Sequence, residues 1–221
     1  MIQALIFDFD GVIIDQSEAL FQAYQHILKR FKVHYSVDDF NRYFGLKGTE
    51  HLCCVLEPQG IMLDDDELEK LIAERDRFYI RLCGAQTQML PGVKRLLDAA
   101  REHGVPLGLA TSTCRRNLDY FLPRLGIEEY FDATVAGDEV TSGKPDPEAY
   151  IAVCSALCVE PALCLGIEDT DYGVAALKRA GLRAVAVTLA NRREHDFAQA
   201  DIVVSSLAEL SWKQIEDITK G

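Results

Sequence analysis

Near its start the chain reads Leu5-Ile6-Phe7-Asp8-Phe9-Asp10-Gly11-Val12-Ile13-Ile14-Asp15, a stretch that combines apolar runs with three aspartates. The run Ala4–Phe7 is short and apolar, which is typical of a strand buried in the middle of a sheet. Two carboxylates, Asp8 and Asp10, follow at the carboxyl end of that strand, where open α/β sheets have their ligand sites. Gly11 interrupts the strand geometry, so the two acids can take different positions around one reacting centre. The same triplet also fits a strand that ends in an ordinary polar loop.

The composition narrows the range of partners. The chain has 221 residues, with 23 lysines and arginines against 35 acids and a formal net charge of −12. Such a surface repels polyanions, so we expect no nucleic acid and no acidic membrane as partners, although a few converging cations can still hold a small anion. No run approaches the ~20 apolar residues of a membrane span.

The N-terminus and the cysteines indicate the compartment. The first apolar run contains Asp8 and lacks a basic region before it, which argues against a signal peptide. The seven cysteines are odd in number and show no metal-ligand spacing. We therefore expect packed free thiols, Cys53, Cys54, Cys154 and Cys158 among them, in a cytoplasmic protein.

Residues from about 16 to 85 show only helical periodicity. Ser17 is a candidate N-cap for the first helix, and Ser36-Val37-Asp38-Asp39 is typical of a capping box that opens the second. Gly45-Leu46-Lys47-Gly48 interrupts the pattern, and Asp64–Asp66 favour the positive end of a longer helix. This part of the chain predicts an all-helical unit. The apolar face of its last helix is expected at Leu68, Leu71, Ile72, Tyr79 and Leu82.

From residue 86 onward apolar strands alternate with helices. This alternation predicts an α/β fold with a doubly wound, Rossmann-like parallel sheet and right-handed crossovers. We expect a core of residues 1–15 and 86–221, with the helical unit of residues 16–85 inserted after the first strand. The expected strands are Leu107–Thr111, Ala133–Ala136, Leu163–Ile167, Ala184–Val187 and Ile202–Val204. The expected helices are Val93–His103, Arg115–Leu125, Pro147–Leu157, Tyr172–Ala180 and Leu207–Ile218.

Polar residues also stand at later strand ends. Thr111-Ser112 ends the second strand, Lys144 precedes a helix within Gly143-Lys144-Pro145-Asp146-Pro147, and Glu168-Asp169 ends a later strand. In a parallel sheet these ends meet the two acids of the first strand at one edge. Carboxylates grouped there need a cation, and an all-oxygen set suits Mg²⁺. A lysine and a hydroxyl can hold an anion beside that metal, which leaves one carboxylate free to attack phosphorus.

These residues also have purely structural interpretations. Thr111 and Ser112 can cap the helix that follows them, and Glu168-Asp169 can form an N-cap pair in the same way. Lys144 can be a solvated loop cation, as most lysines are. The choice between the two interpretations depends on whether the side chains converge.

Four segments, taken in order, resemble the motifs of the haloacid dehalogenase-like superfamily, specifically its branch of phosphatases and β-phosphoglucomutase-like enzymes. The resemblance covers nearly the whole chain, and the helical unit lies where that family has its mobile cap. The segments are Asp8-Phe9-Asp10-Gly11-Val12, Leu109-Ala110-Thr111-Ser112, Lys144-Pro145-Asp146-Pro147 and Gly166-Ile167-Glu168-Asp169.

The resemblance implies a catalytic role for each motif residue. Asp8 would be the nucleophile that forms an aspartyl-phosphate. Asp10 would protonate the leaving oxygen and then take a proton from water. Thr111 would bond a phosphoryl oxygen with Ser112 beside it, and Lys144 would screen the charge between Asp8 and the phosphate.

The resemblance also implies the cofactor and the reaction. Mg²⁺ would lie on Asp8, the main-chain carbonyl of Asp10 and Asp169, with Glu168 as a further or outer ligand. The expected protein is a Mg²⁺-dependent phosphatase, a monomer or weak homodimer, that acts on a small phosphorylated metabolite. A phospho-accepting signalling domain is an alternative of another class, because such domains also combine acids, a Thr or Ser and a Lys on a parallel sheet. The long helical insertion and the acid at Asp10 count against it.

Two residues of the helical unit, Lys47 and His51, are candidate substrate contacts. They also help to judge the second alternative function, that of a sugar phosphomutase. Lys47 stands beside Gly48 where the resembling mutases have a Lys-Gly cap loop, although a solvated turn lysine explains it equally. Those mutases have a cap His soon after the first motif and an Arg four residues after the loop lysine, and here these positions hold Leu20 and His51. Leu20 cannot handle a proton, and His51 lacks the permanent charge and fork of Arg, so the resemblance favours hydrolysis.

Overall fold

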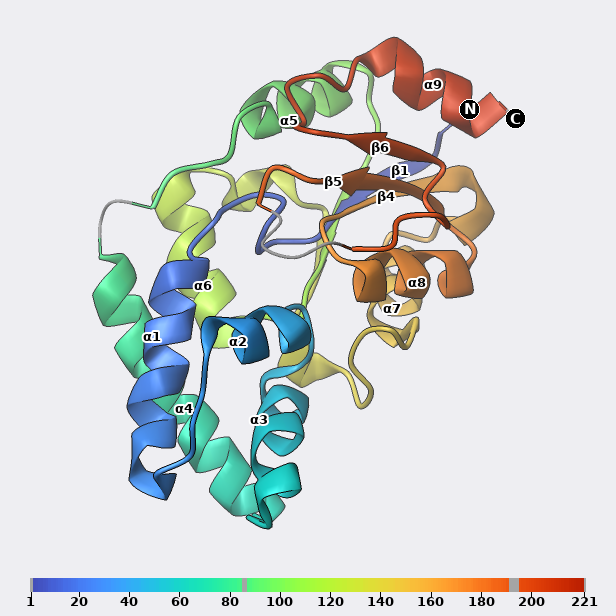
Figure 1. Cartoon of the computed structure of the whole chain (residues 1–221). Coiled ribbons are helices and arrows are strands. Elements are labelled where there is room, and N and C mark those ends of the chain that lie inside the picture. Colours follow the sequence, from blue (N-terminus) through green and yellow to red (C-terminus); the bar gives the residue numbers. More distant parts are fainter. Residues whose placement is uncertain (1, 85–86, 191–194, 221) are drawn as a thin grey trace.

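The central sheet is parallel throughout and carries an insertion of helices after its first strand (Figure 1). The computed structural model describes residues 2–84, 87–190 and 195–220. Its strand order, β3-β2-β1-β4-β5-β6, is that of a doubly wound, Rossmann-like sheet, so the predicted fold class is confirmed. The strands are β1 (Ala4–Phe7), β2 (Leu107–Ala110), β3 (Ala133–Val135), β4 (Cys164–Glu168), β5 (Arg183–Val187) and β6 (Ile202–Val204).

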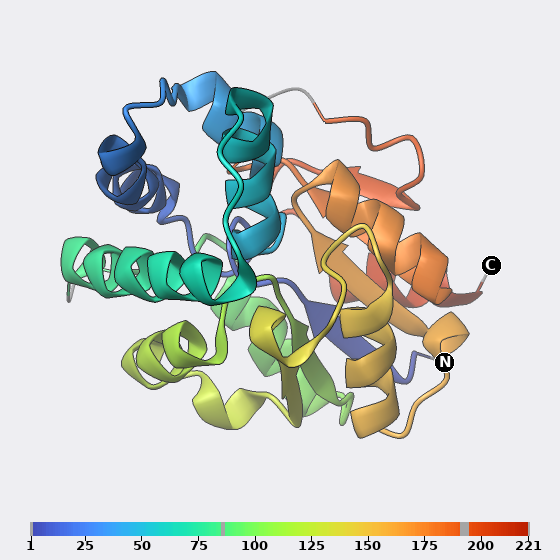
Figure 2. The same ribbon diagram turned by 90° about the horizontal axis from the view of Figure 1, so that it is seen from below.

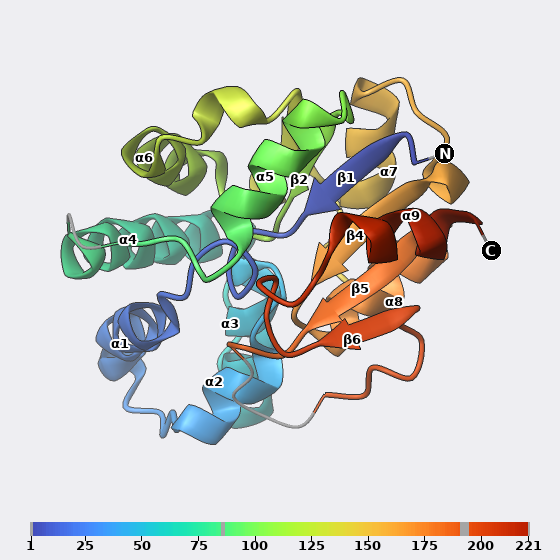
Figure 3. The same ribbon diagram turned by 90° about the horizontal axis from the view of Figure 1, so that it is seen from above.

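The position of β1 in the centre of the sheet explains its continuous apolar sequence. Leu5 and Phe7 point into the hydrophobic cluster on one face, whereas Ala4 and Ile6 point into the cluster on the other. The first face is covered by α5 (Val93–Glu102), α6 (Arg115–Leu125) and α9 (Trp212–Lys220), and the second by α7 (Glu148–Ala156) and α8 (Asp171–Ala180) (Figure 3).

The strand register determines which residues meet at the carboxyl edge of the sheet. Phe7 is paired with Leu109 of β2 on one side and with Ile167 of β4 on the other. The residues that follow these three therefore leave the sheet at the same level. They include Asp8 and Glu168, so the predicted convergence of strand ends has a direct cause in the pairing.

The inserted helices have a hydrophobic core of their own. Its buried members include Ile27, Phe40, Leu52 and Leu68, one from each helix. Helix α4 lies between α1 and α6, which brings the insertion against the sheet domain (Figure 2). The predicted limits of the insertion, residues 16 and 85, stay a prediction, and residue 85 lies outside the described residues. The helices are α1 (Ser17–Leu28), α2 (Val37–Tyr43), α3 (Gly48–Leu56) and α4 (Asp65–Cys83).

Two of the predicted helix starts are confirmed, and a third is wrong. Ser36 and Asp64 open α2 and α4 with reciprocal capping boxes. Ser17, however, is the first residue of α1 and not its N-cap. Its N–H and its hydroxyl donate to Asp15 Oδ1 at 3.1 and 2.9 Å. Asp15 therefore accepts from one of the main-chain N–H groups that have no partner within the first turn of α1.

Three further expectations about packing are corrected. Leu82 is 40 % exposed, so the apolar face of α4 ends before it. The last helix begins at Trp212 and not at Leu207: residues 207–209 form a turn, and Leu207 and Leu210 are buried before the helix starts. All seven cysteines are free, as expected, but Cys158 is exposed. No helix in the described part of the chain has the length and apolar character needed to cross a membrane.

Candidate active site

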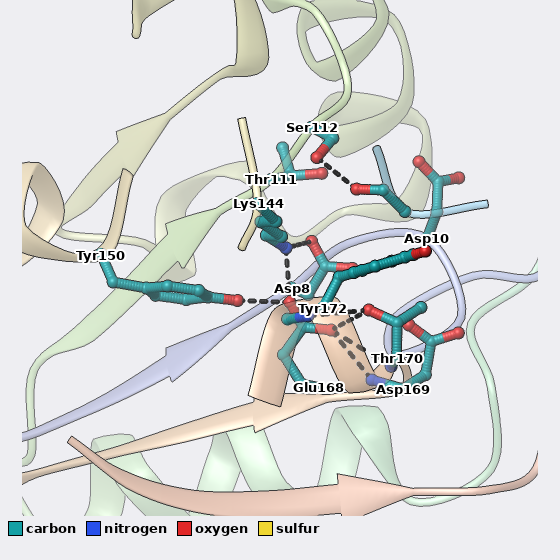
Figure 4. Close-up of polar contacts among 12 residues, drawn as sticks. Asp8, Asp10, Thr111, Ser112, Lys144, Tyr150, Glu168, Asp169, Thr170 and Tyr172 are labelled. Atoms are coloured by element: carbon teal, nitrogen blue, oxygen red, sulfur yellow. Dashed lines mark hydrogen bonds and ion pairs between the residues drawn. The ribbon is translucent and has the colours of Figure 1, made fainter. Parts of the chain in front are cut away.

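The predicted catalytic residues converge at the carboxyl edge of the sheet (Figure 4). Asp8 follows β1, Thr111 follows β2, Lys144 precedes α7, and Glu168 and Asp169 stand at the end of β4. All five side chains are almost completely buried, with at most 6 % of any residue exposed. Five polar or charged residues buried together carry a large desolvation cost unless they satisfy one another or a ligand, so the cluster has the character of a functional site.

Lys144 is the link between the two acidic strand ends. Its Nζ donates to Asp8 Oδ1 at 2.7 Å and to Glu168 Oε1 at 2.5 Å, and the Tyr150 hydroxyl donates to the same Glu168 oxygen at 2.5 Å. Burial alone lowers the pKa of Lys144, but the Asp8 and Glu168 carboxylates outweigh it and raise that pKa overall. The lysine is therefore a fixed positive charge, and its interpretation as a solvated loop cation is wrong.

Glu168 is held by protein donors at both of its oxygens. Besides Lys144 and Tyr150 on Oε1, the Asp169 N–H donates to Oε2 at 3.0 Å. Gly173 makes room for this carboxylate, because a Cβ there would lie 1.9 Å from Glu168 Cδ. Glu168 therefore orients Lys144. Its direct ligation of a metal stays a prediction.

Asp8, Glu168 and Asp169 form a group that fits a metal ion. One oxygen of each lies within 4.8 Å of the others, and Asp169 Oδ1 is buried with no hydrogen-bond partner among the described residues. Burial, assisted by the neighbouring carboxylates, raises the pKa of Asp169, and burial raises that of Asp8 to about 7. Gly11 leaves space here, because a Cβ on it would lie 1.8 Å from Asp169 Oδ2. A hard divalent cation suits this all-oxygen set.

Asp10 has a different environment from Asp8. It is half-buried, and its Oδ2 accepts a hydrogen bond from the Thr113 hydroxyl. Burial raises the pKa of Asp10, and the Thr113 bond offsets that rise in part. A carboxyl with a raised pKa is suited to giving up a proton and taking it back.

Thr111 and Ser112 do not cap the helix that follows them, because the N-cap of α6 is Cys114. Thr111 Oγ1 accepts from the Thr113 N–H at 3.1 Å, and the Ser112 hydroxyl donates to the Gly45 carbonyl of the inserted helices at 2.7 Å. The N-cap interpretation of Glu168-Asp169 is also wrong, since Thr170 caps α8. The roles of Thr111 and Ser112 toward substrate stay predictions.

Lys47 lies at the contact between the inserted helices and the sheet domain. Its Nζ donates to the carbonyls of Val140 and Thr141 at 2.8 and 3.3 Å. Nearby, Glu50 Oε1 accepts from the Gly143 N–H at 3.0 Å. These bonds attach the start of α3 to the segment just before Lys144. A role for Lys47 in substrate choice stays a prediction.

A small cavity of about 50 Å³ separates the acids from the inserted helices. Leu20 and His51, the two residues at the mutase-specific positions, both line it. His51 stacks on Tyr24 with 4.2 Å between ring centroids, and its Nε2 lies 2.7 Å from the Tyr35 hydroxyl. Burial, assisted by nearby Arg75, lowers the pKa of His51 to about 3, so the imidazole is neutral.

Three residues of the site were missed by the sequence analysis: Thr113, Tyr150 and Arg75. Arg75 lines the cavity and is 6 % exposed. The sequence did contain a signal for it, because Arg75 lies four residues from both Leu71 and Tyr79, on the expected apolar face of α4. A charge on such a face indicates a buried ionic contact. Thr113 and Tyr150 carried no comparable signal.

Comparison with known proteins identifies the family. The sequence profile described as haloacid dehalogenase-like hydrolase matches residues 5–187, and the chain belongs to this family. It is 33% identical to "Beta-phosphoglucomutase" of Bacillus subtilis, over 97% of this chain and 94% of that protein. It is 34% identical to "Phosphorylated carbohydrates phosphatase" of Thermotoga maritima, over 83% of each. The solved β-phosphoglucomutase of Clostridium difficile superposes with a TM-score of 0.89 at 26% identity, over 100% of this chain and 98% of that one.

These comparisons confirm three predictions. The resemblance to the phosphatase and β-phosphoglucomutase-like branch is correct, and so is the Rossmann-like fold with a cap. The chain is an enzyme of the haloacid dehalogenase-like phosphatases, which are phosphoric monoester hydrolases.

Proposed function

We propose that this enzyme hydrolyses a small phosphorylated sugar or polyol through an aspartyl-phosphate on Asp8, with Mg²⁺ as cofactor. The observation that carries the proposal is the buried group in which Lys144 joins Asp8 to Glu168, beside an oxygen of Asp169 that has no hydrogen-bond partner in the described part of the chain. The class of substrate is supported by relatives named for phosphorylated carbohydrates and for hexitol phosphates.

Asp8 and Asp10 divide the chemistry. An Asp8 carboxylate oxygen attacks phosphorus while the bond from phosphorus to the leaving oxygen breaks, and Asp10 donates its proton to that oxygen. Asp10 then takes a proton from the water that cleaves the aspartyl-phosphate. This step releases phosphate and restores both carboxyls. Thr111 is placed to donate to a phosphoryl oxygen, and the fixed charge of Lys144 reduces repulsion between Asp8 and the anion.

The cofactor would be held by Asp8, Asp169 and the main-chain carbonyl of Asp10. When bound there, Mg²⁺ supplies positive charge that offsets the repulsion between phosphoryl oxygens and the carboxylates. The separate contacts of Glu168 keep Lys144 in place beside that charge.

Hydrolysis is favoured over isomerisation by the two mutase-specific positions. A mutase must hold a second phosphate and return the phosphoryl group before water reaches it. Leu20 has no proton to exchange, and His51 is a neutral ring already engaged with Tyr35. Neither residue provides the charge that a distal phosphate requires.

The proposal is tested by phosphate release from a panel of phosphorylated metabolites, with and without Mg²⁺. Asp8→Asn should abolish turnover and leave the fold intact by circular dichroism. A variant that keeps a tenth of the wild-type turnover would remove Asp8 from the nucleophile role.

A second assay separates hydrolysis from isomerisation. It supplies β-glucose 1-phosphate with a bisphosphate primer and follows glucose 6-phosphate and free phosphate together. Isomer formation that outruns phosphate release would establish a mutase.

We also propose that the enzyme is cytoplasmic, in keeping with its free thiols, and acts as a monomer or weak homodimer.

A further inference from the structure

Arginine side chains gather in an exposed groove where the cap, made of the inserted helices, meets the sheet domain. The groove has a volume of about 340 Å³ and lies between α4 and α6, which are side by side (Figure 2 and Figure 3). The described residues that line it are Arg77, Ile80 and Arg81 of α4 and Arg116 of α6. We call it the arginine groove. None of these four residues lines the inner cavity at the catalytic acids, so the groove is separate from the proposed chemistry.

The arginine groove concentrates positive charge without a balancing acid. No acidic residue is among the described residues that line it, although the chain as a whole has a net charge of −12. Arg77 and Arg81 stand four residues apart on α4, a spacing at which like charges destabilise a helix. The fold therefore brings together charges that repel one another, and a bound anion would offset that repulsion.

Acids close to the groove along the two helices are paired with other cations. Glu74, one turn before Arg77, accepts from Arg30 at 2.5 Å, and Asp119 on α6 lies 3.8 Å from Arg115 Nη1. In the part of the chain that the structure describes, the three groove arginines form no ion pair and no side-chain hydrogen bond. Their N–H groups are therefore available to a ligand.

The number and arrangement of the charges indicate which anion fits. Arg77 and Arg81 leave the same face of α4 on successive turns, about 5.4 Å apart, and Arg116 comes from the other helix. A guanidinium binds two oxygens of a phosphate at once. A single phosphate group has roughly two negative charges, which is fewer than the positive charges of the groove. A chain of linked phosphoryl groups supplies more charge and greater length. Ile80 is the one apolar residue among those described in the lining, so a hydrophobic ligand finds little to contact.

We propose that the arginine groove binds a small polyphosphate anion, with two or three linked phosphoryl groups, and that this anion joins α4 of the cap to α6 of the sheet domain. The two helices are already in contact at one point, because Asp76 accepts from Asn117 Nδ2 at 3.2 Å. Arg77 follows Asp76 in α4, and Arg116 precedes Asn117 in α6. The bound anion would therefore strengthen an existing contact between the two domains.

A link between the cap and the sheet domain affects turnover. The inner cavity of about 50 Å³ has room for only a few water molecules, so a substrate enters when the cap moves away from the catalytic acids. An anion that holds α4 against α6 opposes this movement and lowers the rate. This effect on the rate rests on the proposed function, whereas binding of the anion does not.

The first test measures binding by isothermal titration calorimetry at low ionic strength. The probe is tripolyphosphate, and EDTA excludes binding through a metal. Tripolyphosphate should bind at least about tenfold more tightly than AMP, which has a single phosphate. ATP distinguishes two sources of the same chemistry: an affinity equal to that of tripolyphosphate supports recognition of the phosphate chain alone, and a higher affinity supports a nucleotide. Binding of AMP as tight as that of tripolyphosphate, or no binding of any probe, overturns the inference.

Arg77→Gln/Arg116→Gln removes one arginine from each helix and should weaken tripolyphosphate binding by at least about tenfold. The matched control is Arg42→Gln/Arg124→Gln, which removes the same charge from exposed positions outside the groove. All four arginines are exposed, so both variants should fold. An equal loss of affinity in the two variants would show unspecific attraction and overturn the inference. Each single variant, Arg77→Gln and Arg116→Gln, should also weaken binding, and a loss in only one of them would exclude a link between the domains.

Turnover separates this site from the proposed function. With Mg²⁺ in excess, saturating tripolyphosphate should lower the wild-type kcat by about fivefold or more, and that of Arg77→Gln/Arg116→Gln by less than about twofold. Equal inhibition of the two proteins would contradict the link to cap movement. No phosphate release from any sugar phosphate in the absence of tripolyphosphate would instead refute the proposed function, and calorimetry would still decide whether the arginine groove binds the anion.

Discussion

Replacement of Gly11 by alanine tests whether the position of Asp169 controls the reaction. Gly11 has φ +86°, which costs a residue with a Cβ roughly 1–2 kcal/mol. Its Cβ would also lie 1.8 Å from Asp169 Oδ2, so that oxygen has to move by about 1 Å or more. A misplacement of about 1 Å can cost on the order of 10² in rate. We therefore expect Gly11→Ala to lose about a hundredfold in kcat and to need more Mg²⁺.

Gly60→Ala is the matched control for this variant. Gly60 has a similar φ of +76°, but nothing lies within 4 Å of the Cβ it would acquire. Both variants should lose stability in urea unfolding, whereas only Gly11→Ala should lose Mg²⁺ affinity in calorimetric titration and turnover at saturating substrate. If Gly11→Ala kept the activity and Mg²⁺ requirement of Gly60→Ala, the proposed link between Asp169 and the metal would be refuted.

Four other predictions follow from the site. Asp10→Asn should slow both proton transfers by ~10²–10⁴-fold in kcat, and a variant with full burst and turnover rates would contradict this. Asp169→Ala should weaken activation by Mg²⁺ more than substrate binding at saturating metal, and activity in verified metal-free enzyme would exclude the mechanism. The pKa of His51 is lowered from 6.5 to about 3 in the folded protein. Between pH 6.5 and pH 3 the imidazole is therefore protonated in the unfolded chain but neutral in the folded one. The free energy of unfolding should fall as pH drops through that range, by up to ~1.4 kcal/mol per pH unit. In urea unfolding, His51→Gln should lose less free energy of unfolding between pH 7 and pH 5 than the wild type does. An equal loss in the two proteins would contradict the prediction. Lys47→Ala should change the ranking of substrates, whereas an equal fall on all of them would limit Lys47 to its contacts with the Val140 and Thr141 carbonyls.

The sequence predicted the residues whose position depends on strand order alone. Asp8 and Glu168 leave adjacent parallel strands at the same level, so an apolar run followed by an acid was enough to bring them together. Lys144 was identifiable because the glycine and prolines around it mark a loop before a helix. These inferences required the topology of the sheet and no knowledge of side-chain packing.

The contacts that depend on docking between the cap and the sheet domain were not predictable. Ser112 bonds the Gly45 carbonyl, which lies 67 residues away in the chain. Arg75 bonds Tyr24 on α1 and its neighbour Asp76, and Asp76 in turn accepts from Asn117 on α6. Tyr150 reaches Glu168 only because α7 packs against the sheet. Sequence periodicity reports which face of an element is buried but not which residue of another element it meets.

The bonds that join α3 to the loop before Lys144 have a consequence for how this enzyme can vary among relatives. Lys47 and Glu50 both bind backbone atoms, the carbonyls of residues 140 and 141 and the N–H of residue 143. Backbone partners persist whatever side chains evolution places at Val140 and Thr141. Gly143 is the exception, because a Cβ there would lie 2.6 Å from the Glu50 carboxylate and would push it away from its bond to the residue 143 N–H. A saturation library over 140–143 should therefore tolerate broad change at residues 140 and 141, whereas a side chain at residue 143 should weaken the contact with Glu50.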